Sequence, residues 1–169
     1  MIRVNLSRLT HVKPGPQETV DLNVGRLAVR DLELSYVRGT LRFTRISHGI
    51  LVEGRLRAAV KAECTRCLTS FSVPITIELE DTISLPGAEL TEERPVRVAD
   101  DGWADLFPLV REYAWVELPV NPICSPDCKG ICPECGGNRN LGECTCDQDG
   151  PIDPRWQALR ALVEHPDEA

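Results

Sequence analysis

Strict alternation of apolar and polar residues dominates the first half of the chain and is typical of strands with one buried face. The alternating segments are residues 18–24, 37–44, 52–62 and 71–80. His48 and Gly49, between the second and third segments, have the composition of a turn, so those two segments predict a long hairpin. Pro74 has no N–H to donate, which predicts a sheet edge or a bulge in the fourth segment. Residues 26–35 are ambiguous.

Two helices are predicted on the carboxy-terminal side of these strands. Asp105 suits the N-cap of a helix that tolerates Pro108 in its first turn and ends before Pro119. Its apolar stripe consists of Leu106, Leu109, Val110, Tyr113 and Val116. Asp153 and Pro154 predict the start of a last helix, because aspartate suits the N-cap and proline the first helical position. The buried stripe of that helix would be Trp156, Leu159, Leu162 and Val163.

Residues 86–102 connect the last alternating segment to the first helix and are strongly acidic. The acidic residues are Glu89, Glu92, Glu93, Asp100 and Asp101. Because apolar residues do not recur there with a regular period, we expect an exposed loop. Such a loop is most often a solvated linker, but an acidic surface can also face a basic protein partner.

Length and composition limit the class of protein. A chain of 169 residues can bury one sizeable core and add a small module. Its first residues lack the basic-then-apolar pattern of a secretory signal, and no apolar run approaches the ~20 residues of a membrane helix. We therefore expect a soluble cytoplasmic protein.

The chain contains eight cysteines, which fall into four close pairs. The pairs are Cys64 with Cys67, Cys124 with Cys128, Cys132 with Cys135, and Cys144 with Cys146. A reducing cytosol disfavours disulfides, and two thiolates a few residues apart are typical ligands of tetrahedral zinc. Gly136 and Gly137 favour a tight turn in which backbone N–H groups approach the sulfur. We predict two closed structural zinc sites; free thiols or disulfides are the alternative.

The four pairs can be divided between two sites in three ways. We favour a local site made of Cys132, Cys135, Cys144 and Cys146, because a short loop rich in Gly and Asn joins these two pairs. The other site would then consist of Cys64, Cys67, Cys124 and Cys128 and would tie a turn between strands to the segment after the helix. A site made of the contiguous Cys124, Cys128, Cys132 and Cys135 competes with this arrangement.

These elements together predict an α+β fold. It consists of an antiparallel β-rich domain with a helix, a cysteine-rich zinc module and a C-terminal helix. The β-rich domain would span residues 1–118 and include the acidic loop, and the zinc module with its helix would span residues 119–169. The second domain has too few apolar residues to fold without a cross-link or a metal.

Charge is unevenly distributed, although the net charge is −7. Residues 1–62 carry 11 Lys and Arg against 5 Asp and Glu, whereas residues 63–169 carry 8 against 21. Period-two spacing places basic residues of the predicted hairpin on one outward face, namely Arg38, Arg42, Arg55, Arg57 and Lys61. We expect this face to contact RNA phosphates. The alternative is that Glu53, Glu78 and Glu80 on the same face neutralise much of the charge through cross-strand pairs.

Candidate catalytic residues do not form a legible pattern in the sequence. His11, His48 and His165 are scattered, and no Ser-His-Asp or paired-carboxylate arrangement is recognisable. We therefore expect no catalytic residues. The tryptophans are expected to pack in the core.

Four sequence elements resemble the YceD family, also called the large ribosomal RNA subunit accumulation protein family. They are Glu63-Cys64-Thr-Arg-Cys67-Leu68, Glu117-Leu118-Pro119-Val120, Cys128-Lys-Gly-Ile-Cys132-Pro-Glu-Cys135-Gly, and Asp153-Pro154-Arg155-Trp156. The resemblance covers most of the chain, whereas residues 1–50 match only in their β-rich pattern.

This resemblance implies a bacterial, non-enzymatic factor for production, processing or stability of the 23S ribosomal RNA. It also implies a ribosome precursor or a basic large-subunit ribosomal protein as partner, with zinc supporting the fold. A thiol-disulfide or iron-sulfur redox protein is the alternative, because Cys64 and Cys67 have redox spacing and four thiolates can hold iron.

Overall fold

A computed structural model describes residues 1–29, 31–92, 94–146 and 155 of the chain. The chain divides into two compact units, Met1–Cys128 and Lys129–Ala169. The predicted C-terminal helix, which would begin at Asp153, lies outside the described residues. Among the described residues, no helix has the length and apolar character needed to cross a membrane.

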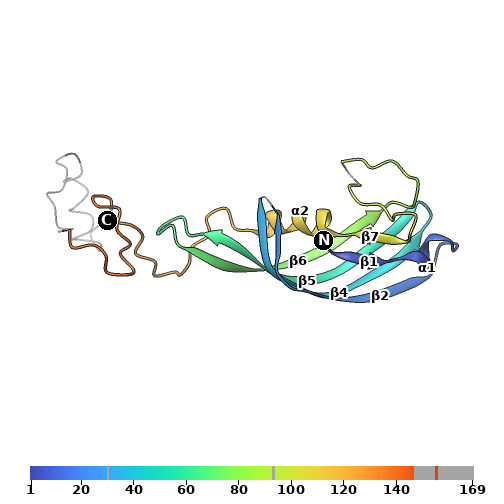
Figure 1. The fold of residues 1–169 in the computed structure, drawn as a ribbon, viewed down its shortest axis with the longest axis horizontal. Coiled ribbons are helices and arrows are strands. Elements are labelled where there is room, and N and C mark those ends of the chain that lie inside the picture. Colours follow the sequence, from blue (N-terminus) through green and yellow to red (C-terminus); the bar gives the residue numbers. More distant parts are fainter. Residues whose placement is uncertain (30, 93, 147–154, 156–169) are drawn as a thin grey trace, which may run out of the picture. The chain divides into compact units, whose positions relative to one another are not determined.

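The first unit is built on a five-stranded antiparallel sheet (Figure 1). Its strands are β2 (Gln17–Val24), β3 (Leu27–Val29), β4 (Leu32–Ile46), β5 (Gly49–Glu63) and β6 (Ser70–Ile83). The order is β2-β4-β5-β6, and β3 pairs with β4 beside β2. The predicted hairpin is confirmed as β4 and β5, which a turn at residues 47–48 connects. Pro74 lies in β6, which is an edge strand, so its missing N–H does not interrupt hydrogen bonding between two inner strands.

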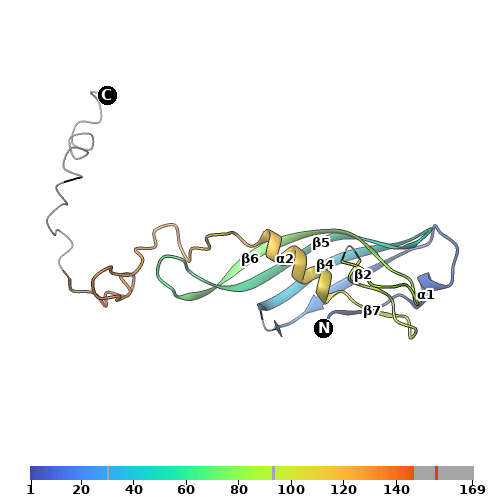
Figure 2. The same ribbon diagram turned by 90° about the horizontal axis from the view of Figure 1, so that it is seen from above.

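A second layer covers one face of this sheet. It contains β1 (Arg3–Asn5), α1 (Ser7–Thr10), β7 (Trp103–Asp105) and α2 (Phe107–Glu117). β1 and β7 form a two-stranded antiparallel sheet, and α2 lies along the main sheet beside it (Figures 1 and 2). The predicted α+β class, with antiparallel strands and a helix, is therefore confirmed. The helix α1 and the short strands β1, β3 and β7 did not emerge from the sequence pattern.

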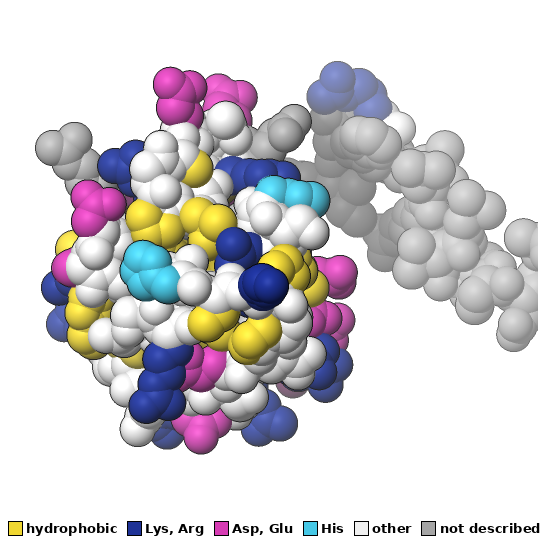
Figure 3. All heavy atoms as spheres, turned by 90° about the vertical axis from the view of Figure 1, so that its right-hand side faces the viewer, with side chains coloured by type: hydrophobic (Ala, Val, Ile, Leu, Met, Phe, Trp, Pro, Cys, Tyr) yellow, Lys and Arg dark blue, Asp and Glu magenta, His cyan; other side chains and the backbone are white. Residues whose placement is uncertain are grey.

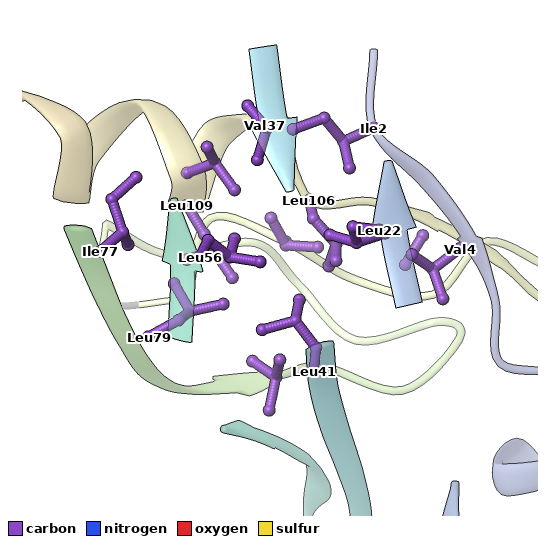
Figure 4. Close-up of a cluster of buried hydrophobic side chains, with 14 of the residues drawn as sticks. Ile2, Val4, Leu22, Val37, Leu41, Leu56, Ile77, Leu79, Leu106 and Leu109 are labelled. Atoms are coloured by element: carbon purple, nitrogen blue, oxygen red, sulfur yellow. The ribbon is translucent and has the colours of Figure 1, made fainter. Parts of the chain in front are cut away.

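The core lies between the main sheet and this second layer. Figure 4 shows Ile2 and Val4 near the start of the chain, Leu41 and Leu56 in the sheet, and Leu109 of α2 in one cluster. Burying a large aliphatic side chain contributes about 1.5–3 kcal/mol, so this cluster is the main source of stability in the first unit. The alternating apolar positions of β4, β5 and β6 supply most of it.

The burial of side chains contradicts two predictions made from the sequence for residues 86–116. Val96 and Val98 are 4% and 0% exposed, so the acidic segment is not wholly a surface loop. Its residue Arg97 forms a parallel bridge with Ser84, which places these two valines inward. In α2 the buried residues are Leu109, Val110 and Ala114, while Val116 is exposed because it faces away from the sheet.

The start of α2 is tied to the start of the chain through Asp105. The carboxylate of Asp105 accepts hydrogen bonds from the N–H of Phe107 at 3.1 Å and from the N–H of Ile2 at 2.8 Å. The first bond satisfies a donor at the helix end, but the N-cap of α2 is Leu106, so the prediction of Asp105 as the N-cap is wrong by one position. Trp103 and Trp115 are 37% and 44% exposed, so the expectation that they pack in the core is wrong.

Candidate metal centres and the basic sheet face

Cys64, Cys67, Cys124 and Cys128 come together in the first unit. The first two lie in the turn between β5 and β6, and the other two follow α2. Their four sulfur atoms lie within 4.8 Å of one another. The Sγ atoms of Cys64 and Cys128 are 3.8 Å apart, and those of Cys67 and Cys124 are 3.6 Å apart. A metal held tetrahedrally by sulfurs at about 2.3 Å separates them by about 3.8 Å, so this group can hold a metal ion.

Backbone hydrogen bonds build the turn that presents Cys64 and Cys67. The N–H of Leu68 donates to the carbonyl of Cys64 at 2.9 Å, and the N–H of Cys64 donates to the carbonyl of Thr69 at 3.0 Å. Leu68 has a φ of 58°, an uncommon value for a residue with a side chain. The N–H of Thr65 donates to the carbonyl of Pro122 at 3.0 Å, which docks the segment after α2 onto the turn.

The thiols of this group differ in acidity. Burial opposes ionisation of Cys64, but backbone N–H groups of Cys124, Cys67 and Arg66 aimed at its sulfur lower its pKa to about 6. The thiol of Cys67 and burial raise the pKa of Cys124 to about 12. One thiolate therefore forms readily, and further negative charge beside it is unfavourable unless a cation compensates it.

Cys132, Cys135, Cys144 and Cys146 form a second group in the second unit, again with all four sulfurs within 4.8 Å. The N–H of Gly136 donates to the carbonyl of Cys132, and the N–H of Cys132 donates to the carbonyl of Gly137, both at 2.9 Å. Gly136 has a φ of 71°, which is the left-handed conformation expected of glycine in this turn. Of these cysteines, Cys132 is buried, whereas Cys135 is exposed.

The thiols of the second group also differ in acidity. Backbone N–H groups of Cys135 and Glu134 lower the pKa of Cys132 to about 6. The neighbouring thiols of Cys135 and Cys144 raise the pKa of Cys146 to about 12. All eight cysteines are free, and the structure divides them between two groups in the arrangement that the sequence analysis favoured.

The five predicted RNA-contacting residues lie on the sheet face that points away from α2, but their charges are not equally available. Arg42 forms a salt bridge with Glu53 at 3.1 Å, Arg55 pairs with Glu78, and Lys61 lies 3.6 Å from Glu33. Arg38 and Arg57 form no salt bridge with any described residue. The alternative kept from the sequence, neutralisation by Glu53, Glu78 and Glu80, therefore applies to two of the five through Glu53 and Glu78. Lys61 is paired with a carboxylate that the sequence did not suggest, and Glu80 forms no salt bridge with a described residue.

The acidic segment is exposed at the positions that the sequence analysis named. Glu89, Glu92 and Asp100 are exposed, and Asp101 forms a salt bridge with Arg3 at 3.3 Å. Glu93 lies outside the described residues. At the end of the molecule seen in Figure 3, Lys and Arg side chains are interspersed with Asp and Glu side chains. The charge asymmetry along the sequence does not become a continuous basic surface in that view.

Tyr36 is a surface residue that the sequence analysis did not single out. Tyr36 lies opposite Ala59 on the outward face, at the end of the register that runs from the hairpin turn, and a bulge follows between Tyr36 and Leu34. The Arg38 guanidinium carbon lies 5.5 Å from the centre of the Tyr36 ring. The period-two pattern could have revealed this neighbour, because Tyr36 and Arg38 are two residues apart on one strand and the bulge lies before both of them.

Comparison with known proteins finds a family model that matches most of the chain. The family model described as "Large ribosomal RNA subunit accumulation protein YceD" matches residues 52–163, a range that contains all eight cysteines. An uncharacterized protein of Mycobacterium tuberculosis is 35% identical over 126 residues, which cover 73% of this chain and 60% of that protein. The chain thus spans about 60% of the length of this relative.

Two further relatives are more distant. The uncharacterized protein YlbN of Bacillus subtilis is 26% identical over 154 residues, which cover 90% of this chain and 89% of that protein. A chloroplastic protein of Arabidopsis thaliana, named large ribosomal RNA subunit accumulation protein YCED homolog 1, is 27% identical over 127 residues. That match covers 58% of this chain and 40% of the plant protein. No solved structure matches the chain.

Proposed function

The chain belongs to the YceD family, and on that premise we propose that it is a non-enzymatic factor of the bacterial cytoplasm. It supports the synthesis, processing or stability of the large-subunit (23S) ribosomal RNA. Its partners are the ribosomal RNA or a ribosome precursor, and a basic large-subunit ribosomal protein. The observation that carries this proposal is the family match, since the plant relative is itself named for accumulation of that RNA.

Two zinc ions have a structural role in this proposal. Cys64, Cys67, Cys124 and Cys128 would hold one ion, and Cys132, Cys135, Cys144 and Cys146 the other. Four thiolates complete a tetrahedral shell, so neither site would offer an open position for substrate or activated water. The ions would instead supply the cross-links that hold the turn after β5 and the loops after Cys128.

A redox function has less support from the geometry. Cys64 and Cys67 have the spacing of a redox pair, but they are only 0% and 5% exposed. A reactive thiolate needs access to its partner disulfide, and neither sulfur has it. Iron in place of zinc is distinguished by the visible spectrum of the isolated protein, because iron bound by thiolates absorbs and zinc does not.

Deletion and complementation test the proposed function. Cells that lack the gene should contain less 23S RNA relative to 16S RNA, and the full-length chain should restore the ratio. The protein should also sediment with large-subunit precursors. An unchanged ratio after deletion, together with sedimentation only as free protein, would contradict the proposal.

A further inference from the structure

Two arginines face each other at the centre of the exposed sheet face. Arg38 of β4 is the register partner of Arg57 of β5. The row continues to Asn23 of β2 on one side and to Thr76 of β6 on the other. Like charges directly opposite on neighbouring strands are destabilising, and this row contains no carboxylate to offset them.

The neighbouring rows of the same face differ from this row, because they contain carboxylates that offset their cations. In one row Arg55 pairs with Glu78, and Thr40 donates a hydrogen bond to Asp21 at 2.6 Å. In the next row Arg42 pairs with Glu53. Uncompensated positive charge is therefore concentrated at Arg38 and Arg57, both of which are exposed.

A shallow hollow of about 620 Å³ lies at the same place on the first unit. It is lined by Tyr36, Arg38, Gly39, Thr40, Arg55 and Arg57. Its volume is within the range of about 300–1,000 Å³ that is usual for small-molecule sites. Tyr36 lies two residues before Arg38 on the same face of β4, so its half-buried ring stands at the rim beside the Arg38 guanidinium.

β4 and β5 approach each other closely in this region. A Cβ atom at Gly39 would lie 2.2 Å from the carbonyl oxygen of Arg55, and one at Gly54 would lie 2.3 Å from that of Thr40. The absence of both Cβ atoms lets the two strands approach closely under the hollow. Gly39 also lines the hollow, so backbone forms part of the surface beside the cations and the ring.

We propose that this hollow binds one nucleotide of single-stranded RNA. Its phosphate lies between the Arg38 and Arg57 guanidinium groups, where it relieves their repulsion, and its base stacks on Tyr36. Single-stranded RNA fits because its bases are free to stack on an aromatic ring, whereas duplex RNA keeps them paired inside. This inference rests on the proposed function in ribosomal RNA accumulation and assigns the contact to a site with Tyr36 at its rim.

The proposed RNA contact and a purely structural role of Arg57 predict different effects of replacing this residue. Replacing Arg57 with glutamine removes one member of a like-charge pair, so Arg57→Gln should leave the melting temperature of the free protein unchanged or raise it. The same substitution should weaken RNA binding. A structural role would instead lower the stability and leave RNA binding to any other surface intact.

Binding of the zinc-loaded full-length chain to a labelled ten-nucleotide single-stranded RNA tests the proposal by fluorescence anisotropy. Arg38→Gln with Arg57→Gln should weaken binding at least tenfold and flatten the salt dependence, by about 0.7 in log–log slope for each lost phosphate contact. Tyr36→Ala should weaken binding about tenfold, whereas Tyr36→Phe should bind normally. The matched control is Arg42→Gln, whose arginine is already paired with Glu53 and lies outside the hollow.

Several results would overturn the proposal. They are unchanged affinity and salt slope in the double variant, equal losses in Arg42→Gln and the double variant, or a wild-type preference for duplex RNA. Binding of an acidic peptide but not of the oligonucleotide would assign the hollow to a protein partner instead.

The cellular experiment separates failure of this inference from failure of the proposed function. If gene deletion leaves 23S RNA unchanged, the proposed function fails, while the binding data still decide the site. If deletion lowers 23S RNA and the double variant both restores it fully and binds RNA normally, the function stands and the site is wrong.

Discussion

The sulfur atoms of Cys64 and Cys128 lie 3.8 Å apart although 64 residues separate them in the sequence. Between them the chain forms the edge strand β6, the acidic segment and α2. A metal ion at this group would therefore close a long loop around the end of the sheet. Closing such a loop restricts the unfolded chain more than a local cross-link does.

Loss of one ligand from either cysteine group should remove the ion of that group and leave the ion of the other group bound. Cys64→Ser should leave a protein that binds one zinc ion in native mass spectrometry, compared with two in the wild type. Hydrogen exchange should increase at the turn before β6 and near Pro122, because a metal ion would no longer hold these segments together. Retention of two ions would contradict the ligand assignment of the first group.

Cys135→Ser should have its effect in the second unit. Metal binding supplies about 10–16 kcal/mol in comparable small zinc modules, and residues 129–146, the continuous part of this unit that the structure describes, have few buried apolar side chains to replace it. The amide signals of residues 129–146 should collapse to unfolded positions, while the spectrum of the sheet stays unchanged. The matched comparison is Cys64→Ser, and collapse of the same signals in that variant would argue against two independent sites.

Gly39→Ala should destabilise the sheet, because the new Cβ would lie 2.2 Å from the Arg55 carbonyl oxygen, and Gly39 has a φ of +154°. Separating two paired strands to relieve such a clash costs about 2–3 kcal/mol, measurable as a lower urea midpoint. Gly25→Ala is the control, since a Cβ atom added at Gly25 would meet nothing within 4 Å. Equal midpoints in the two variants would show that β4 and β5 can separate freely there.

The ion pair between Asp31 and Arg111 predicts a pH-dependent contribution to stability. The Arg111 guanidinium holds the pKa of the Asp31 carboxyl below its usual 3.8. A lowered folded-state pKa stabilises the fold above the unfolded pKa, and this stabilisation is lost as the pH falls through the folded value. The urea midpoint of Asp31→Asn should therefore be below that of the wild type at pH 7, and the two should converge below about pH 4.

A double-mutant cycle provides the control for this ion pair. Arg111→Gln should lower the midpoint in the same way as Asp31→Asn, and the double variant should lose little more than either. Additive losses at pH 7 would mean that the two side chains contribute independently and that the pair itself does not stabilise the fold.

The acidic segment predicts a salt-sensitive interaction with a basic partner such as a ribosomal protein. Complementary charge mainly raises the association rate, so neutralising the segment should slow capture of the partner most at low salt. The variant would replace Glu89, Glu92, Glu93, Asp100 and Asp101 with their amides. Partner recovery from cells, measured by quantitative mass spectrometry at two salt concentrations, should fall. Unchanged recovery at both concentrations would remove the proposal.

The sequence by itself determined the main strands and the chemistry of the cysteine pairs. Period-two alternation specifies an extended strand with one apolar face because successive side chains point to opposite sides, which is a property of the local backbone. The long hairpin β4–β5 and the edge strand β6 followed from that rule. Short spacing between two thiols likewise predicts a shared ligand turn, since only a few residues must adopt the required conformation.

Tertiary structure alone decided which distant segments meet. The strands β1 and β7 are three residues each, too short to show a period, and they pair Arg3 with Asp105 across the chain. Register decided which arginines lack a compensating carboxylate: the pairing that runs from the hairpin turn sets Arg38 opposite Arg57, while the β5–β6 pairing gives Arg55 a carboxylate. Local periodicity fixes the face on which a side chain lies, but its neighbour across the sheet depends on how the strands align.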